Sequence, residues 1–103
     1  MLGMGDWSHE VHDDATLAGD YASLPETKQV DAYTWVGSRI LLERTLPGTS
    51  GISDDMRRCA ACDSVETACI YVHYFHHIVE SDITLELRCE QCGKFTVHHY
   101  ERL

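Results

Sequence analysis

Two short cysteine motifs, Cys59-Ala60-Ala61-Cys62 and Cys89-Glu90-Gln91-Cys92, decide the fold that this sequence predicts. Two residues between cysteines allow a tight turn to direct both sulfur atoms at one ion. If antiparallel strands bring the two turns together, four thiolates complete a tetrahedron with metal–sulfur bonds of about 2.3 Å. Such a site has no open position for water. We therefore expect one structural Zn²⁺, held by Cys59, Cys62, Cys89 and Cys92.

The segments around these motifs predict strands. Residues 69–79 are rich in Ile, Val, Tyr and Phe, which favour strands. Residues 83–88 alternate apolar and polar side chains with a period of two, as a half-buried strand does. Residues 80–82 are typical of a turn, and residues 95–100 predict a third strand. Residues 57–103 are thus expected to form a three-stranded antiparallel sheet closed by zinc.

The stretch Leu87-Arg88-Cys89-Glu90-Gln91-Cys92-Gly93-Lys94-Phe95-Thr96 resembles the second cysteine turn of zinc-ribbon proteins. In that superfamily a glycine follows the second cysteine and an aromatic residue lies two positions further on. Residues 57–100 are similar to the ribbons of transcript-cleavage factors and small RNA polymerase subunits, and this resemblance implies docking on transcription machinery. The sequence departs from it in two places. Asp63 stands where a glycine is usual, and the catalytic Asp-Glu pair of cleavage factors has no counterpart.

The rest of the chain predicts three further segments, so that the whole is a small α+β or mostly β protein. Residues 1–24 have no sustained period and predict an acidic arm. Residues 25–46 predict a helix that begins near Pro25, with a hairpin that turns at Gly37-Ser38 as the alternative. Residues 47–56, which contain Pro47 and Gly48, predict a linker.

The net charge of −9 argues against autonomous nucleic-acid binding. Acidic residues concentrate in residues 1–31, where Lys28 is the one basic residue; they are Asp6, Glu10, Asp13, Asp14, Asp20, Glu26 and Asp31. A phosphate backbone would be repelled by such a surface, so we expect a protein partner. An odd number of cysteines argues against a disulfide framework. With no long apolar segment and no secretory signal in residues 1–14, we expect a cytoplasmic protein with no membrane contact.

These observations favour a non-enzymatic accessory factor or regulator that docks on RNA polymerase or another large assembly. Two other non-enzymatic functions stay open: a zinc-stapled structural component, as in a virus particle, and an acidic inhibitor that mimics nucleic acid. An HNH-type nuclease is a further alternative, because His76-His77-Ile78-Val79 lies between the two cysteine pairs and His77 would act as the base. Iron is an alternative to zinc, since rubredoxin-like sites use the same cysteine spacing.

Several other residues carry two interpretations each. The histidines of the strands, His73, His77, His98 and His99, either contribute to a second metal site or make ordinary hydrogen bonds, and we favour the second. Cys69 is expected to be a small buried hydrophobic residue. Basic residues flank the cysteine motifs and either compensate the thiolates, which we favour, or touch phosphate; they are Arg57, Arg58, Arg88 and Lys94. Trp35 is expected in the core, and Trp7 could anchor an interface.

Overall fold

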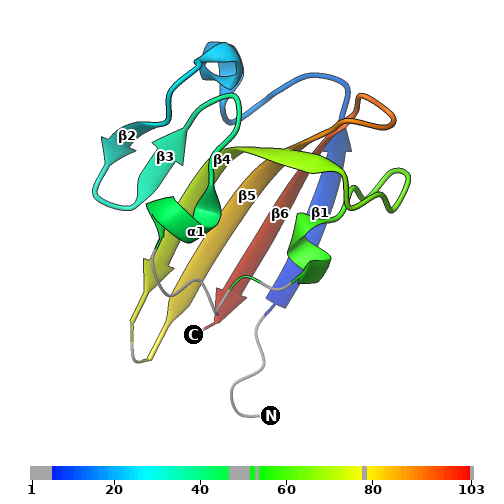
Figure 1. Cartoon of the computed structure of the whole chain (residues 1–103). Helices are drawn as coiled ribbons and strands as arrows, with labels where there is room; N and C mark the ends of the chain where they lie inside the picture. The colour runs from blue at the N-terminus through cyan, green and yellow to red at the C-terminus, as the bar shows by residue number, and fades with distance from the viewer. Residues whose placement is uncertain (1–5, 47–51, 53, 78, 103) are drawn as a thin grey trace.

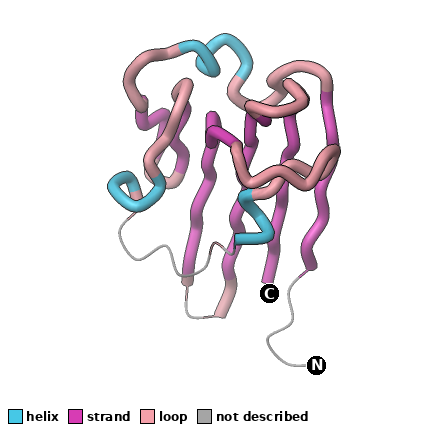
Figure 2. The backbone as a smooth tube through the Cα atoms, turned by 45° about the vertical axis from the view of Figure 1, so that its right-hand side comes forward, coloured by secondary structure: helices cyan, strands magenta, loops and turns pink. Residues whose placement is uncertain are grey.

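Three long strands from the C-terminal half form the centre of an antiparallel sheet. They are β4 (Thr67–His76), β5 (Ser81–Cys89) and β6 (Phe95–Arg102). This computed structural model describes residues 6–46, 52, 54–77 and 79–102. In these residues the sheet has six strands in the order β1-β6-β5-β4-β3-β2 (Figure 1). The sheet is a single layer (Figure 2). The protein is therefore mostly β with one short α-helix in the described residues, which is the second of the two fold classes that the sequence predicted.

The three strands predicted in residues 57–103 are confirmed, with shifted ends. On β5 the side chains of Ile83, Leu85 and Leu87 are buried on one face, as the period of two predicts. The turn is placed earlier than predicted, because β5 already begins at Ser81 and the His77 N–H donates to the Glu80 carbonyl at 2.8 Å. The fold class is thus broader than a three-stranded ribbon, since further strands extend the sheet at both edges.

The N-terminal arm predicted for residues 1–24 is wrong for the residues that the structure describes. Strand β1 (Asp6–His12) pairs with β6 from Asp6 opposite Glu101 to His12 opposite Phe95. Most side chains of β1 are exposed, so this edge strand has no apolar period to detect in the sequence. A short 3₁₀ helix, η1 (Gly19–Ser23), follows in the loop that leads away from β1. Residues 1–5 lie outside the described residues.

The helix predicted for residues 25–46 is wrong, and the alternative hairpin turns at a different place. Strands β2 (Lys28–Asp31) and β3 (Thr34–Val36) form the hairpin. It turns at Ala32-Tyr33, where the Tyr33 N–H donates to the Asp31 carboxylate at 2.9 Å. The only α-helix in the described residues is α1 (Leu42–Thr45). Val30 and Tyr33, which would line a buried helical face, are 44% and 47% exposed.

Helix α1 and the 3₁₀ helix η2 (Asp54–Arg57) cover one face of the sheet (Figure 1). The core beneath them combines residues from both halves of the chain: Ile40, Leu42, Leu46, Ile52, Met56, Cys69, Val72, Ile83, Leu85 and Leu87. Trp35 is half-buried and packs against this core. The linker prediction for residues 47–56 is therefore wrong for Ile52 and for Met56 of η2, while 47–51 and 53 lie outside the described residues. No helix among the described residues is long and apolar enough to cross a bilayer.

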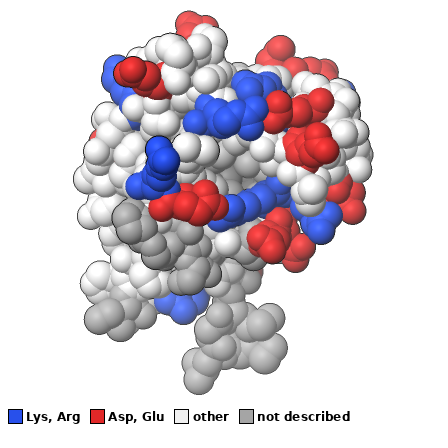
Figure 3. Space-filling view, in the orientation of Figure 1, with Lys and Arg blue, Asp and Glu red and all other residues white. Residues whose placement is uncertain are grey.

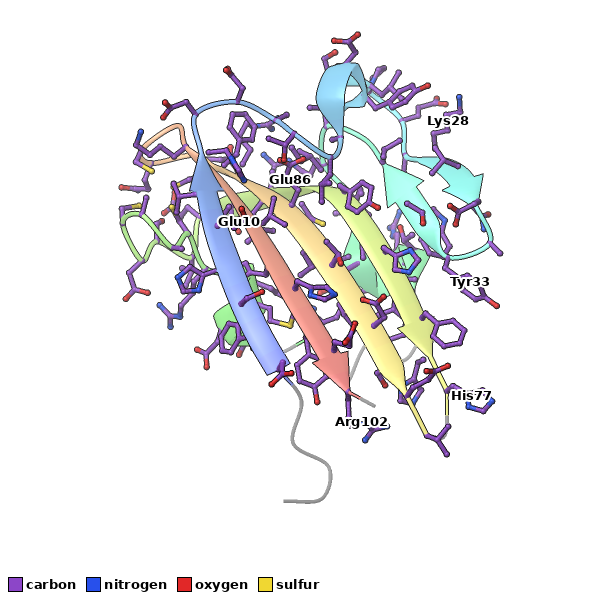
Figure 4. The ribbon with its side chains drawn as sticks, turned by 180° about the vertical axis from the view of Figure 1, so that it is seen from behind. Glu10, Lys28, Tyr33, His77, Glu86 and Arg102 are labelled. Carbon is purple, nitrogen blue, oxygen red and sulfur yellow. The ribbon has the colours of Figure 1, made fainter. Side chains whose placement is uncertain are left out.

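The loop after β1 crosses the other face of the sheet at one end, where it covers Glu86 of β5 (Figure 4). Glu86 is fully buried, and both of its carboxylate oxygens accept two hydrogen bonds. The donors are the N–H and hydroxyl of Thr16 and the N–H groups of Leu17 and Ala18, at 2.8–3.0 Å. The rest of this face carries half-buried and exposed side chains, both polar and aromatic, such as His73, Phe75 and Thr84, and we call it the open face.

Candidate metal centre

The two cysteine motifs lie at the same end of the sheet. Cys59 and Cys62 belong to the loop between η2 and β4, whereas Cys89 ends β5 and Cys92 lies in the turn to β6. The four sulfur atoms lie within 4.8 Å of one another. The Sγ atoms of Cys59 and Cys92 are 3.6 Å apart, and those of Cys62 and Cys89 are 3.5 Å apart. The structure thus brings together the four cysteines that the spacing predicted.

These separations fit one tetrahedral metal ion. A tetrahedron with metal–sulfur bonds of about 2.3 Å has sulfur atoms about 3.8 Å apart. The separations of 3.5 and 3.6 Å fall slightly below that value. None of the five cysteines forms a disulfide. The cluster is therefore a candidate site for one structural ion such as Zn²⁺, with all four ligands supplied by the protein.

The backbone of the two cysteine turns follows the same hydrogen-bond pattern. The N–H groups of Asp63 and Gly93 donate to the carbonyls of Cys59 and Cys89, each four residues earlier, at 2.8 and 3.1 Å. Asp63 and Gly93 both have a positive φ, of 63° and 77°. Asp is one of the few residues that adopt this conformation without a large penalty. The aspartate at position 63, where zinc ribbons have glycine, is thus compatible with the turn.

The turns favour the thiolate form of Cys59 and Cys89 but not of Cys62. The Ala61 N–H points at the Cys59 sulfur at 3.3 Å, and the N–H groups of Gln91 and Cys92 point at the Cys89 sulfur at 3.4 Å. Burial opposes ionisation of Cys59, but hydrogen bonds from backbone N–H groups and neighbouring thiols outweigh it and lower its pKa to about 7. The pKa of Cys89 is lowered against burial in the same way. The Ser64 N–H lowers the pKa of Cys62, but hydrogen bonds with the neighbouring thiols and desolvation outweigh it and raise that pKa to about 12. Deprotonated sulfur is the form that binds metal.

Thr96 on β6 contacts the first cysteine turn and was missed from the sequence. Its hydroxyl oxygen accepts a hydrogen bond from the Ala60 N–H at 3.1 Å. The same hydroxyl donates to the Cys59 sulfur at 3.9 Å. Thr96 is 1% exposed. Such outer contacts hold metal ligands in position. The Gly93-Lys94-Phe95-Thr96 stretch gave no signal for this role, because the contact depends on how β6 packs against the first turn.

His98 packs beside the cluster as a neutral imidazole. Its Nε2 lies 2.7 Å from the Arg58 carbonyl, which can only accept, so Nε2 carries the proton. Its Nδ1 then accepts from the indole N–H of Trp7 at 3.3 Å. Burial lowers the pKa of His98, against the hydrogen bond to Arg58. Trp7, which is 46% exposed, therefore has a structural contact through its indole N–H.

We expect His98 to titrate with a midpoint below 6.5 in an NMR pH titration of its ring, and to keep the Nε2–H form above that midpoint. Because the unfolded chain would take up this proton first as the pH falls, the free energy of unfolding decreases as the pH falls below about 6.5. A His98→Gln variant should show a smaller decrease in urea denaturation over that range. A midpoint at or above 6.5 would contradict the neutral assignment.

The structure also places the strand histidines and Cys69, which the sequence singled out. His73 Nδ1 lies 2.9 Å from the Thr34 hydroxyl, and His99 Nε2 lies 2.9 Å from the Asp82 carboxylate. His77 is exposed in the turn after β4. The hydrogen bonds that we expected for these strand positions are thus present at His73, His98 and His99. Cys69 is buried in the core, as expected, and burial raises the pKa of its thiol to about 12.

The basic residues around the cysteine motifs have partners within the chain. Arg57 lies 2.9 Å from Glu43, Arg58 lies 3.8–3.9 Å from Asp55 and Asp63, and Lys94 lies 2.6 Å from Asp13. Arg88 donates to the Ser38 carbonyl. Positive and negative side chains accordingly alternate over the face that α1 and η2 cover (Figure 3). This arrangement supports charge compensation rather than a phosphate-binding patch.

No family model, curated protein or solved structure matches this chain.

Proposed function

We propose that this chain is a non-enzymatic zinc protein whose stiffened sheet presents an acidic segment, residues 6–31, to a basic surface of a protein partner. One observation carries the proposal. The acidic residues of this segment are exposed on a backbone that the sheet holds in place: Asp6, Glu10, Asp13, Asp14, Asp20, Glu26 and Asp31. Strand β1 is fixed by its pairing with β6, and the following loop is fixed by its hydrogen bonds to Glu86.

A fixed acidic segment is suited to docking for two physical reasons. Complementary charge steers a basic partner to the surface and excludes partners of like charge. A segment that is already ordered loses little further conformational entropy when it binds. The four-cysteine cluster supports a scaffold role, because a closed tetrahedral site offers no position for a substrate or water.

The partner class that we favour is transcription machinery or another nucleic-acid assembly, such as RNA polymerase. Proteins of this class have basic grooves that bind phosphate, to which the acidic segment is complementary. The zinc-ribbon resemblance of residues 57–100 supports the same class. Inhibition by mimicry of nucleic acid is the closest alternative, because the same acidic residues would occupy the groove.

The experiment is a nuclease-treated pull-down from native host lysate with three forms of the chain. An Asp14→Asn, Asp20→Asn, Glu26→Gln variant removes three negative charges from the acidic segment. A Glu66→Gln, Glu80→Gln, Asp54→Asn variant removes three exposed charges elsewhere and is the matched control. We expect the wild type and the control to recover RNA polymerase subunits, and the acidic-segment variant to recover about ten-fold less.

Other results of this pull-down, or of a DNA-cleavage assay, would overturn the proposal in distinguishable ways. Equal recovery by all three forms would show that the acidic segment does not dock. Recovery of only the chain itself, or of capsid-like proteins, would favour the structural-component alternative. Metal-dependent DNA cleavage that a His77→Ala variant abolishes would favour the nuclease.

A further inference from the structure

Three side chains of types that can bind a metal ion lie close together on the open face, at the end of the sheet far from the cysteines. Asp82 belongs to β5, and His99 and Glu101 belong to β6. One ligand atom from each lies within 4.8 Å of the others. Register explains the meeting, because Asp82 stands opposite Glu101, and His99, two positions before Glu101 on β6, shares its face. We call these three residues the open-face triad.

We propose that the open-face triad binds a divalent first-row transition metal ion, with Zn²⁺ as the probe. Imidazole nitrogen and carboxylate oxygen bind such ions at about 2.0–2.2 Å. Two ligand atoms are then about 3.4 Å apart at the tetrahedral angle and about 3.0 Å apart at a right angle. His99 Nε2 and Asp82 Oδ1 are already 2.9 Å apart. The ion would take the place of the hydrogen bond between these two atoms, with the proton of the neutral His99 ring on Nδ1, and a rotation of Glu101 would supply the third ligand.

The charges around the triad give an independent reason for a cation there. The pairing places Asp6 opposite Glu101, and Glu101 opposite Asp82, so that acidic residues occupy facing positions on three adjacent strands. Like charges at facing positions destabilise a sheet. Among the described residues, His99 is the only histidine whose ring is hydrogen-bonded to the Asp82 carboxylate. A bound divalent cation would offset this repulsion directly.

The surroundings leave room for the other positions of the ion. A cavity of about 190 Å³ lies beside the triad and is lined by Phe75, Glu80, Ser81, Asp82 and Glu101. The side chains of His99 and Asp82 are 39% and 42% exposed. In Figure 4 the strands of this face are not covered by other elements at the end that carries Arg102. The site would therefore be open and exchangeable, in contrast to the closed cysteine cluster, and water or a partner's ligand could complete it.

The test is calorimetric titration of Zn²⁺ into the full chain that already holds one zinc per molecule at its cysteines. We expect a second, saturable equivalent, and a shift of the His99 ring resonances at the same stoichiometry. Each of Asp82→Asn, His99→Asn and Glu101→Gln should weaken the second equivalent by at least about ten-fold, because each removes a ligand. The matched controls are Glu10→Gln and His12→Asn on neighbouring β1, which remove the same groups from the same face outside the triad.

The first zinc and the near-UV circular dichroism report folding of each variant separately from the second site. Absence of a second saturable equivalent at millimolar Zn²⁺ would overturn the proposal. So would equal weakening by the control substitutions, which would show general attraction of the cation to an acidic face. Because the triad lies outside the acidic segment, its failure would leave the proposed docking function untouched.

Discussion

A Cys89→Ser, Cys92→Ser variant is expected to contain no tightly bound zinc and to lose the native fold. Structural zinc contributes about 10–16 kcal/mol in small zinc-binding peptides, whereas a domain of this size is stable by about 5–15 kcal/mol in total. Cys89 ends β5, and β5 is a central strand of the sheet. Loss of the metal should therefore affect the whole sheet. We expect near-UV circular dichroism and cooperative urea unfolding to disappear, both in this variant and after chelation of the wild type.

Cys69→Ala is the matched control for thiol loss. Cys69 is buried in the core away from the metal cluster, so this variant should lose some stability through packing but keep one zinc per chain. Elemental analysis of the purified proteins separates the two effects, and a colourless wild type with one zinc would exclude iron. Native unfolding behaviour in the metal-free chain would contradict the structural role of the site.

Glu86→Gln is expected to destabilise the protein by about 3 kcal/mol and to release the loop that follows β1. Each carboxylate oxygen of Glu86 accepts from two donors. If the glutamine NH₂ group faces Leu17 and Ala18, two backbone N–H groups lack an acceptor. If it faces Thr16, the hydroxyl can accept from it, but the Thr16 N–H lacks an acceptor. A buried donor without a partner costs about 1–3 kcal/mol. Hydrogen exchange should become roughly a hundred-fold faster at the amides of Thr16, Leu17 and Ala18.

Glu10→Gln is the matched control, because Glu10 stands two strands away in the same cross-strand row and is exposed. This substitution should change the free energy of unfolding by less than about 0.5 kcal/mol. Unchanged exchange at residues 16–18 in Glu86→Gln would show that the loop is held by other contacts. If the loop is released, the proposed docking function predicts weaker capture of the partner as well, since the acidic segment would no longer be preorganised.

The metal cluster and the three central strands could be predicted because their signals are local. The spacing within each cysteine motif sets the geometry of one turn, and the alternation of Ile83, Leu85 and Leu87 reports which side of a strand is buried. Even the unusual Asp63 keeps this local character, since its positive φ belongs to the turn itself.

The hairpin shows where a local signal was misleading. The apolar residues of 25–46 fit a helical period, but Val30 and Tyr33 are exposed and the carboxylate of Asp31 closes a turn instead. Pairing of β3 with β4 decides this segment, from Thr34 opposite His73 to Val36 opposite Tyr71. Such pairing replaces weak helical preferences with backbone hydrogen bonds to a distant strand.

By itself the sequence determined which four cysteines form the candidate metal site and the central β4-β5-β6 arrangement, since both depend on neighbouring residues. Only the tertiary structure decided that β1 completes the sheet beside β6, that Glu86 holds the loop after β1, and that Asp82, His99 and Glu101 meet. Each of these features joins segments far apart in the chain through strand register or through hydrogen bonds from backbone N–H groups. Every residue but proline carries the same N–H group, so residue identity does not reveal which distant partner it will find.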